Sequence, residues 1–287
     1  MDKPSQSLIE QWMAITTGPT HYTQACDGQF DRRYWPHLRV IFHRMCARGI
    51  AESVGGKEGM YRMVENGAKP LDWQSFEKSK DSGLILPFDL RKYVFIYPDT
   101  TTVIAGSKSS GKTGFLYRTV ALNMNNANTV LLTNLEGGVG MLRDRFEAMD
   151  IEIPNPAPFK VIPVYDNFHD YIKEPDTIYV VDYIDAPDGA DFFKIGYRIQ
   201  KIDKKLQGLN SVAVIGLQKP STRDTAFGGE QTLRTATLYI ALDSKKLKIV
   251  DAKVSADKKA HPKNRSWSFD YDDEGTRFVN IQESWMA

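Results

Sequence analysis

The sequence predicts an α/β protein in which a mostly parallel central sheet is flanked by helices and preceded by a small N-terminal domain. Two observations predict this fold. From about residue 91 onward, short apolar runs rich in Val, Ile and Leu alternate with helical segments, as in a parallel sheet with its crossovers. The first of these runs, residues 102–105, leads directly into a glycine-rich loop and a helical segment at residues 115–126. The 287 residues suffice for one such domain and a smaller module.

The glycine-rich loop fills the phosphate-binding pattern G-x-x-x-x-G-K-[ST] with Gly106, Gly111, Lys112 and Thr113. The glycines let the backbone curl, so that successive N–H groups point inward and form an anion site at the start of the next helix. We expect Lys112 to reach the β- and γ-phosphates of ATP and the Thr113 hydroxyl to ligate Mg²⁺. The residues expected to bind the nucleotide are Gly106, Ser107, Lys108, Ser109, Ser110, Gly111, Lys112, Thr113 and Gly114. A glycine-rich turn without a nucleotide is the alternative.

Two carboxylates follow buried strands of the predicted sheet. The apolar run at residues 129–134 ends just before Glu136, and the run at residues 178–182 ends in Asp182. Ligands bind at the carboxyl ends of strands in open α/β sheets. We therefore expect Glu136 to orient the attacking water and Asp182 to hold Mg²⁺ beside Thr113. The alternative for each is a solvated carboxylate at a strand end.

A third apolar run, residues 211–217, ends in Gln218. A polar amide at this place can sense the γ-phosphate and transmit its loss to the loop that follows. That loop, residues 220–231, carries Arg223 and is predicted to be a polar, moving contact loop for DNA. An ordinary solvent loop is the alternative. Further strands are predicted at residues 237–242, 246–252, 267–271 and 277–281.

Residues 1–65 predict a winged helix-turn-helix domain, joined by a linker at residues 66–90 to the ATPase domain at residues 91–287. Helical spacing occurs at residues 7–15 and 34–48, with a further short segment between them. A hairpin pattern with a glycine-rich turn follows the second helix. The apolar face of that helix is formed by Leu38, Ile41, Phe42 and Met45.

Basic residues of this domain are the expected DNA contacts. In a winged helix-turn-helix one helix enters the major groove and the wing rests on phosphates. The residues expected to contact DNA are Arg32, Arg33, Arg39, Arg44, Lys57 and Arg62, together with Arg223 of the later loop. The alternative is that these arginines form a solvated face of a domain that serves packing, oligomerisation or protein docking.

Composition narrows the class of protein. The formal net charge of +1 neither favours nor excludes nucleic acid, because local patches matter more than the sum. The two cysteines, Cys26 and Cys46, form no C-x-x-C pair, so neither a disulfide framework nor a zinc site is predicted. No apolar run approaches the ~18 residues of a membrane span, and the N-terminus lacks a signal-peptide core. A cytoplasmic protein without membrane contact is expected.

The order of these motifs resembles the RecA-like ATPases, and within them the DnaB-type replicative helicases and small phage or plasmid RecA-like ATPases. The stretches that carry the resemblance are residues 131–138 with Met141, Leu142 and Arg145 beyond them, residues 180–184, and residues 213–218. They look like the family's segment with the catalytic glutamate, its metal-binding strand with an Asp-Tyr pair, and its strand ending in a sensor glutamine. The N-terminal block looks like winged helices fused to such ATPases in mobile elements.

The resemblance implies homo-oligomers, either rings or filaments, in which a basic residue of one subunit completes its neighbour's site. Residues 249–253 look like the segment that supplies this residue, which makes Lys253 the candidate. The arginine expected two residues later is absent, since position 255 is Ser. Other basic residues that can substitute are Lys258, Lys259 and Arg265.

Together these observations predict an ATP-hydrolysing, DNA-binding protein of a mobile element, helicase- or recombinase-like, that acts in DNA replication, recombination or repair. The expected cofactors are ATP and Mg²⁺. The expected partners are single- or double-stranded DNA, further copies of the chain and replication proteins. Two alternatives are an ATP-gated DNA-binding regulator with little turnover and a replisome assembly factor.

Overall fold

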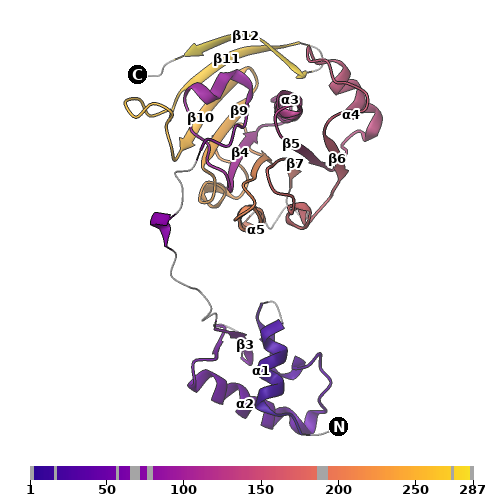
Figure 1. The fold of residues 1–287 in the computed structure, drawn as a ribbon, viewed down its shortest axis with the longest axis vertical. Coiled ribbons are helices and arrows are strands. Elements are labelled where there is room, and N and C mark those ends of the chain that lie inside the picture. Colours follow the sequence, from indigo (N-terminus) through magenta and orange to yellow (C-terminus); the bar gives the residue numbers. More distant parts are fainter. Residues whose placement is uncertain are drawn as a thin grey trace. The chain divides into compact units, whose positions relative to one another are not determined.

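The chain divides into two compact units, residues 1–77 and 78–287 (Figure 1). The computed structural model describes residues 3–15, 18–55, 58–64, 72–75, 80–185, 193–272 and 275–284.

The smaller unit packs two α-helices against a three-stranded antiparallel sheet with the strand order β1-β3-β2. Its elements in chain order are α1 (Gln6–Ile15), β1 (Thr20–His21), 3₁₀ turns at Tyr22–Gln24 and Arg32–Tyr34, α2 (Trp35–Ala47), β2 (Ala51–Ser53) and β3 (Met60–Met63). The spacing of apolar residues in α2 is confirmed, because Leu38, Ile41, Phe42 and Met45 are its buried residues.

The segment between β1 and α2, expected to supply a further helix, forms 3₁₀ turns instead. Three consecutive residues there, Cys26, Asp27 and Gly28, have positive φ angles of 52°, 59° and 72°. A right-handed α-helix cannot continue through such residues, so the segment bends back on itself.

The larger unit is built on a nine-stranded sheet with the strand order β12-β11-β10-β9-β4-β8-β7-β5-β6 (Figure 1). Its strands are β4 (Thr100–Gly106), β5 (Asn128–Thr133), β6 (Lys160–Pro163), β7 (Thr177–Ile184), β8 (Val212–Gln218), β9 (Leu238–Asp243), β10 (Lys246–Ala252), β11 (Ser266–Asp272) and β12 (Arg277–Ser284). The six strands from β9 to β6 pair in parallel, and β10, β11 and β12 extend one edge in antiparallel fashion. This is the α/β architecture that the sequence predicts.

Helices cover both faces of this sheet. The α-helices of the larger unit are α3 (Lys112–Asn123), α4 (Gly138–Glu147) and α5 (Phe193–Leu206). In β4, Ile104 joins the core that contains Phe115 of α3, and its neighbour Val103 joins the separate core that contains Ile199 of α5. Because both faces are buried, the central strands have continuous apolar sequences. Within the described residues, no helix combines the length and the apolar character that crossing a membrane requires.

Part of the segment predicted as a linker belongs to the larger unit. Leu84, Leu86, Phe88 and Leu90 are all buried in the core beneath α3. The alternation of apolar and other residues at these positions is the signal of burial, and the loop-like composition just before them obscured it. The prediction that the linker extends to residue 90 is therefore wrong from about residue 80 onward, where the described chain resumes.

The side chain of Asn123 fixes this segment to the end of α3. Asn123 is fully buried; its Oδ1 accepts a hydrogen bond from the Ile85 N–H at 2.9 Å, and its Nδ2 donates to the Ile85 carbonyl at 2.8 Å. The amide thus satisfies both backbone groups of a residue that lies outside any strand.

Asn123→Ala should lower the free energy of unfolding by about 2 kcal/mol, because two backbone groups of Ile85 lose their partner in a buried setting. Urea denaturation followed by circular dichroism measures this change. Asn125→Ala is the matched control, since Asn125 is exposed and two residues away. Equal midpoints for the two variants would contradict the assignment of Asn123 as an anchor.

Candidate nucleotide-binding site

The glycine-rich loop lies between the carboxyl end of β4 and the first residue of α3, as the motif requires. Gly111 caps the helix with a φ of 83°, in the left-handed region that favours glycine. A side chain at Gly106 is excluded for another reason, because a Cβ there would lie 2.6 Å from the Ser110 Oγ. Both glycines of the pattern are thus required by the local geometry of the loop.

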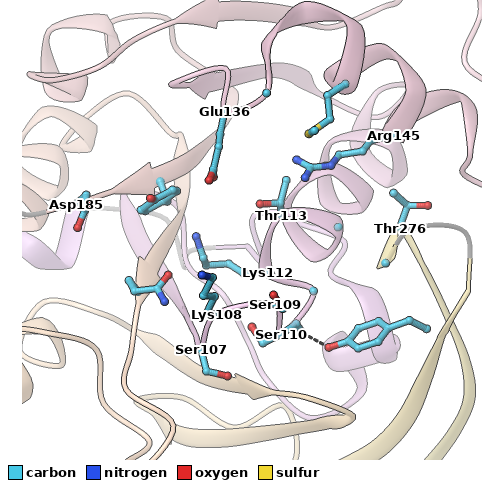
Figure 2. A pocket seen from close by; sticks show the side chains of 18 residues that line it. Ser107, Lys108, Ser109, Ser110, Lys112, Thr113, Glu136, Arg145, Asp185 and Thr276 are labelled. Atoms are coloured by element: carbon cyan, nitrogen blue, oxygen red, sulfur yellow. Dashed lines mark hydrogen bonds between the residues drawn. The ribbon is translucent and has the colours of Figure 1, made fainter.

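A cavity of about 830 Å³ opens directly over this loop (Figure 2). Its floor is formed by residues 107–114, and β5, β7, β8, α4 and the β11–β12 turn contribute its walls. The lining residues outside the loop are Glu136, Gly137, Met141, Arg145, Tyr183, Asp185, Gln218, Tyr271, Gly275 and Thr276. The cavity therefore gathers most of the predicted site residues at the carboxyl edge of the parallel sheet.

Lys112, Thr113 and Asp182 form a compact charged cluster beside the loop. The Lys112 Nζ lies 3.9 Å from the Asp182 Oδ1, and the Thr113 hydroxyl donates to the same oxygen at 3.4 Å. Lys112 is 7% exposed and Asp182 is 4% exposed. The Lys112 Nζ also lies 3.6 Å from the centre of the Tyr183 ring. The predicted neighbourhood of Thr113 and Asp182 is present in this geometry.

These buried charges compensate each other only in part. Burial lowers the pKa of the Lys112 ammonium, and it raises the pKa of the Asp182 carboxyl; in both cases the charge of the other residue opposes the shift. A bound polyphosphate places negative charge beside Lys112, and a hard divalent cation places positive charge beside Asp182. The pair is thus suited to a ligand that carries both charges.

The loop and the oxygen atoms around it fit a nucleotide with Mg²⁺. The hydroxyls and carboxylates that Mg²⁺ prefers are supplied by Thr113 and Asp182. The Ser110 Oγ is buried and has no hydrogen-bond partner among the described residues. Such an orphaned polar atom in a phosphate-binding loop is suited to an additional acceptor from a ligand.

Glu136 and Gln218 both line the cavity. Glu136 lies three residues beyond β5, and its side chain points toward Lys112 and Thr113 (Figure 2). Gln218 is the last residue of β8 and pairs in register with Gly106 of β4. The two residues thus face the loop from neighbouring parts of the same sheet edge.

Lys253 lies elsewhere. It follows β10, and its Nζ donates to the carbonyls of Arg234 and Thr235 at 3.4 and 3.3 Å. Its backbone N–H donates to the Thr237 carbonyl, at the end of the sheet opposite the glycine-rich loop. Within one chain, Lys253 therefore does not reach the cavity.

The loop after β8 is held more firmly than its polar sequence predicts. Lys219 is 2% exposed, and its Nζ donates to the Asp243 carboxylate at 2.6 Å and to the Arg223 carbonyl at 3.0 Å. The Phe227 N–H donates to the Gln218 carbonyl at 2.9 Å. The start of the loop is therefore bonded to β9, and its far side is bonded to the end of β8. Arg223 itself does not line the cavity.

The predicted DNA-contacting residues of the smaller unit are spread over α2, the turn before it and β3. Arg32 and Arg33 lie over the rings of Trp35 and Tyr34, at 5.3 and 4.9 Å. Arg39 pairs with Glu58 at 2.8 Å, and Arg62 pairs with Glu52. Arg44 is exposed on α2. Lys57 lies outside the described residues.

Sequence reasoning did not find the part of the site that the β11–β12 hairpin supplies. The Tyr271 hydroxyl donates a hydrogen bond to the Ser110 carbonyl, drawn as a dashed line in Figure 2. A Cβ at Gly111 would lie 2.5 Å from the Tyr271 ring, and one at Gly114 would collide with the Gly275 carbonyl. The hairpin thus packs directly on the loop. The 161 residues between Ser110 and Tyr271 explain why no local pattern indicated this contact.

Asp185 and Arg145 also line the cavity, although no role was predicted for them. Asp185 follows β7 directly, and Arg145 projects from α4 toward Thr113 (Figure 2). A polar residue after a parallel strand is the signal that could have indicated Asp185, whereas Arg145 was noted only within the resemblance to the ATPases.

Comparison with solved structures agrees with this description of the fold. A KaiC-like protein of the hyperthermophilic archaeon Pyrococcus horikoshii OT3 is 16% identical, with a TM-score of 0.53 over 71% of this chain and 99% of that one. A second solved structure, of an ATPase domain, is also 16% identical, with a TM-score of 0.51 over 70% of this chain and 90% of that one. No protein-family model matches the sequence, and no curated protein sequence matches it.

The larger unit therefore has the fold of the RecA-like P-loop ATPases. The parallel sheet with helices on both faces and the phosphate-binding loop after β4 are the features of this fold, and the two solved structures are similar to it in fold. The predicted fold class of the larger unit is confirmed.

Tyr271→Phe should weaken ATP binding about five-fold. The variant lacks one hydrogen bond to the Ser110 carbonyl, and the free energy that holds the loop in its binding conformation should fall by about 1 kcal/mol. Titration with a fluorescent ATP analogue measures the dissociation constant. Tyr97→Phe is the control, since Tyr97 is an exposed tyrosine that does not line the cavity. Equal affinities for both variants and the parent would show that the hydroxyl does not organise the loop.

Proposed function

We propose that the chain binds ATP with Mg²⁺ in the cavity over the glycine-rich loop, hydrolyses it, and uses the cycle to act on DNA in replication, recombination or repair. The observation that carries this proposal is the buried cluster of Lys112, Thr113 and Asp182, with Glu136 facing it across the cavity. The RecA-like fold supports the same conclusion, since it places these residues at one sheet edge.

In this proposal each residue acts by position and charge. The backbone N–H groups of residues 107–113 bind the phosphates, and Lys112 neutralises charge on the β- and γ-phosphates. Thr113 and Asp182 would hold Mg²⁺, which would supply positive charge beside the phosphoryl oxygens. Glu136 accepts a hydrogen bond from the attacking water and orients it in line with the γ-phosphate.

Gln218 connects the nucleotide state to the loop after β8. Its side chain lines the cavity while its carbonyl binds the Phe227 N–H. A shift of Gln218 on loss of the γ-phosphate would be passed to this loop, because Lys219 fixes the loop at Arg223. We assign Arg223 and its loop to DNA contact on this basis.

The smaller unit is assigned to DNA as a winged helix-turn-helix. Its support is the order of helices and strands and the strand order β1-β3-β2, with α2 in the place of the recognition helix. The sequence of α2 contains two arginines, two histidines and no acidic residue. Its exposed Arg39 and Arg44, with Arg32 and Arg33 in the preceding turn, are the phosphate or base contacts of this assignment. Arg62, on β3, and Lys57 complete the proposed contact set.

The proposal includes assembly of several copies into a ring or filament, as in DnaB-type helicases and phage or plasmid RecA-like ATPases. Lys253 would then enter the site of a neighbouring copy, because it lies too far from the cavity of its own chain. The same proposal places the protein in the cytoplasm and in a mobile element. It also includes docking to replication proteins. The second candidate function is an ATP-gated DNA-binding regulator or a replisome assembly factor with little turnover.

Glu136→Gln should retain ATP affinity while losing turnover by roughly 100-fold or more, because the amide cannot orient and polarise water as the carboxylate does. Phosphate release, measured with and without single- and double-stranded DNA, gives the rate. Lys112→Ala should instead lose ATP binding itself. A parent rate that is negligible with every DNA would favour the regulator or assembly factor over the enzyme.

Arg44→Ala should weaken duplex DNA binding and reduce the slope of log affinity against log salt by about 0.9, the change expected for one fewer bound phosphate. Fluorescence anisotropy at several salt concentrations measures both quantities. Arg143→Ala, in α4 of the larger unit, is the control, since Arg143 is exposed and paired with Glu147. Unchanged binding by Arg44→Ala would favour a protein-docking role for α2.

A further inference from the structure

Exposed tyrosines of the larger unit gather on one surface beside α5. Four tyrosines of this unit are strongly exposed among its described residues: Tyr97, Tyr165, Tyr171 and Tyr197, at 37%, 75%, 38% and 59%. All but Tyr97 lie on α5 or on the segment that follows β6. Large exposed aromatic rings that gather in one place indicate an interaction surface.

This segment and α5 pack against each other. The segment includes a 3₁₀ turn at Phe168–Tyr171, which contacts α5, and the Arg198 Nη2 of α5 pairs with the Asp166 Oδ1 at 3.2 Å. A cavity of about 270 Å³ lies between the two elements, and Tyr197, His169 and Lys201 are among its lining residues. Figure 1 shows α5 on the outside of the larger unit, with its inner side against the sheet.

Positive charge accompanies the aromatic rings. Tyr197, Lys201 and Lys205 recur at every fourth position and therefore form one stripe along α5. The Lys201 Nζ lies 4.9 Å from the centre of the Tyr197 ring. Lys204 extends the stripe on the same exposed side.

The acidic residues nearby leave this charge in excess. Asp166 is occupied by Arg198, and Asp203 on α5 is directed to the Thr101 hydroxyl at 3.5 Å. Asp170 remains exposed beside His169. Burial lowers the pKa of His169, the charge of Asp170 opposes this shift, and the charges of Lys201 and Lys205 add to it.

We propose that Tyr197, Lys201 and Lys205 of α5, with Tyr165 and Tyr171 beside them, form a binding surface for single-stranded nucleic acid. Unpaired bases stack on exposed tyrosine rings, and lysines at intervals along the same face bind the phosphates between them. One ring and two lysines lie along about two turns of α5, and the other two rings lie on the segment that packs against it. A duplex keeps its bases stacked inside and offers no base face to these rings.

The surface is also connected to the nucleotide cavity. The Arg198 Nη1 donates to the Asp185 carbonyl at 2.6 Å, and Asp185 lines the cavity over the glycine-rich loop. Arg198 therefore links α5 directly to a residue of the nucleotide cavity. This inference adds a second nucleic-acid surface to the proposed function and does not depend on the DNA contacts assigned to the smaller unit.

The test measures binding of a fluorescein-labelled oligothymidylate to the full-length protein by anisotropy. Tyr197→Ala should weaken binding roughly ten-fold, because it removes stacking, while Tyr197→Phe retains parental affinity because its ring is kept. Lys201→Ala with Lys205→Ala should reduce the salt slope by about 0.7 for each phosphate that is no longer bound. Lys246→Ala is the matched control for the lysines, since Lys246 is exposed at the start of β10, a strand that pairs with β9 and β11.

Three further readings complete the test. For Tyr197→Ala, the affinity for a labelled duplex and the rate of ATP hydrolysis without DNA should both stay within two-fold of the parent. A failure of the proposed surface can thus be told apart from a failure of the proposed function. Equal loss of duplex and single-strand affinity would overturn the proposal in favour of an unspecific basic patch. A change of mass in light scattering with unchanged oligothymidylate affinity would overturn it in favour of an interface between copies. If Tyr197→Ala does not fold, the salt slope of the lysine variant decides.

Discussion

The site of the larger unit depends on one electrostatic constraint: the charged groups of Lys112 and Asp182 are both buried. The charge of each residue offsets only part of the pKa shift that burial causes in the other. Two charged groups removed from water are costly unless further partners satisfy them. At 3.9 Å the pair leaves room for the opposite charges of a phosphate chain and a hard cation. The parallel strands bring the pair together, because β4 and β7 end at the same edge with β8 between them.

Three neighbouring residues surround this pair, and each is placed by a contact or by its position in the sheet. Thr113 bonds to Asp182, Tyr183 lies under the Lys112 ammonium, and Gln218 ends the strand that separates β4 from β7. Each of these residues is fixed by a strand or a helix start. The part of the site beside the glycine-rich loop is therefore held by β7, β8 and the start of α3.

The sequence allowed most residues around the cavity to be brought together in advance, because they occur at the ends of recognisable apolar strands and in one local motif. Glu136, Asp182 and Gln218 could each be placed in this way. The contact of Tyr271 with the loop could not, because it depends on antiparallel pairing near the far end of the sheet. Residues 84–90 were misjudged because the loop-like composition just before them obscured their apolar pattern, and because the bond of Ile85 to Asn123 spans 38 positions.

The hairpin of β11 and β12 has a consequence for how the protein matures during synthesis. The glycine-rich loop emerges from the ribosome long before Tyr271, which bonds to Ser110 and covers Gly111. Until the hairpin has docked, the nascent chain presents this loop without its cover. The loop therefore reaches the geometry described here only after the last two strands have joined the sheet.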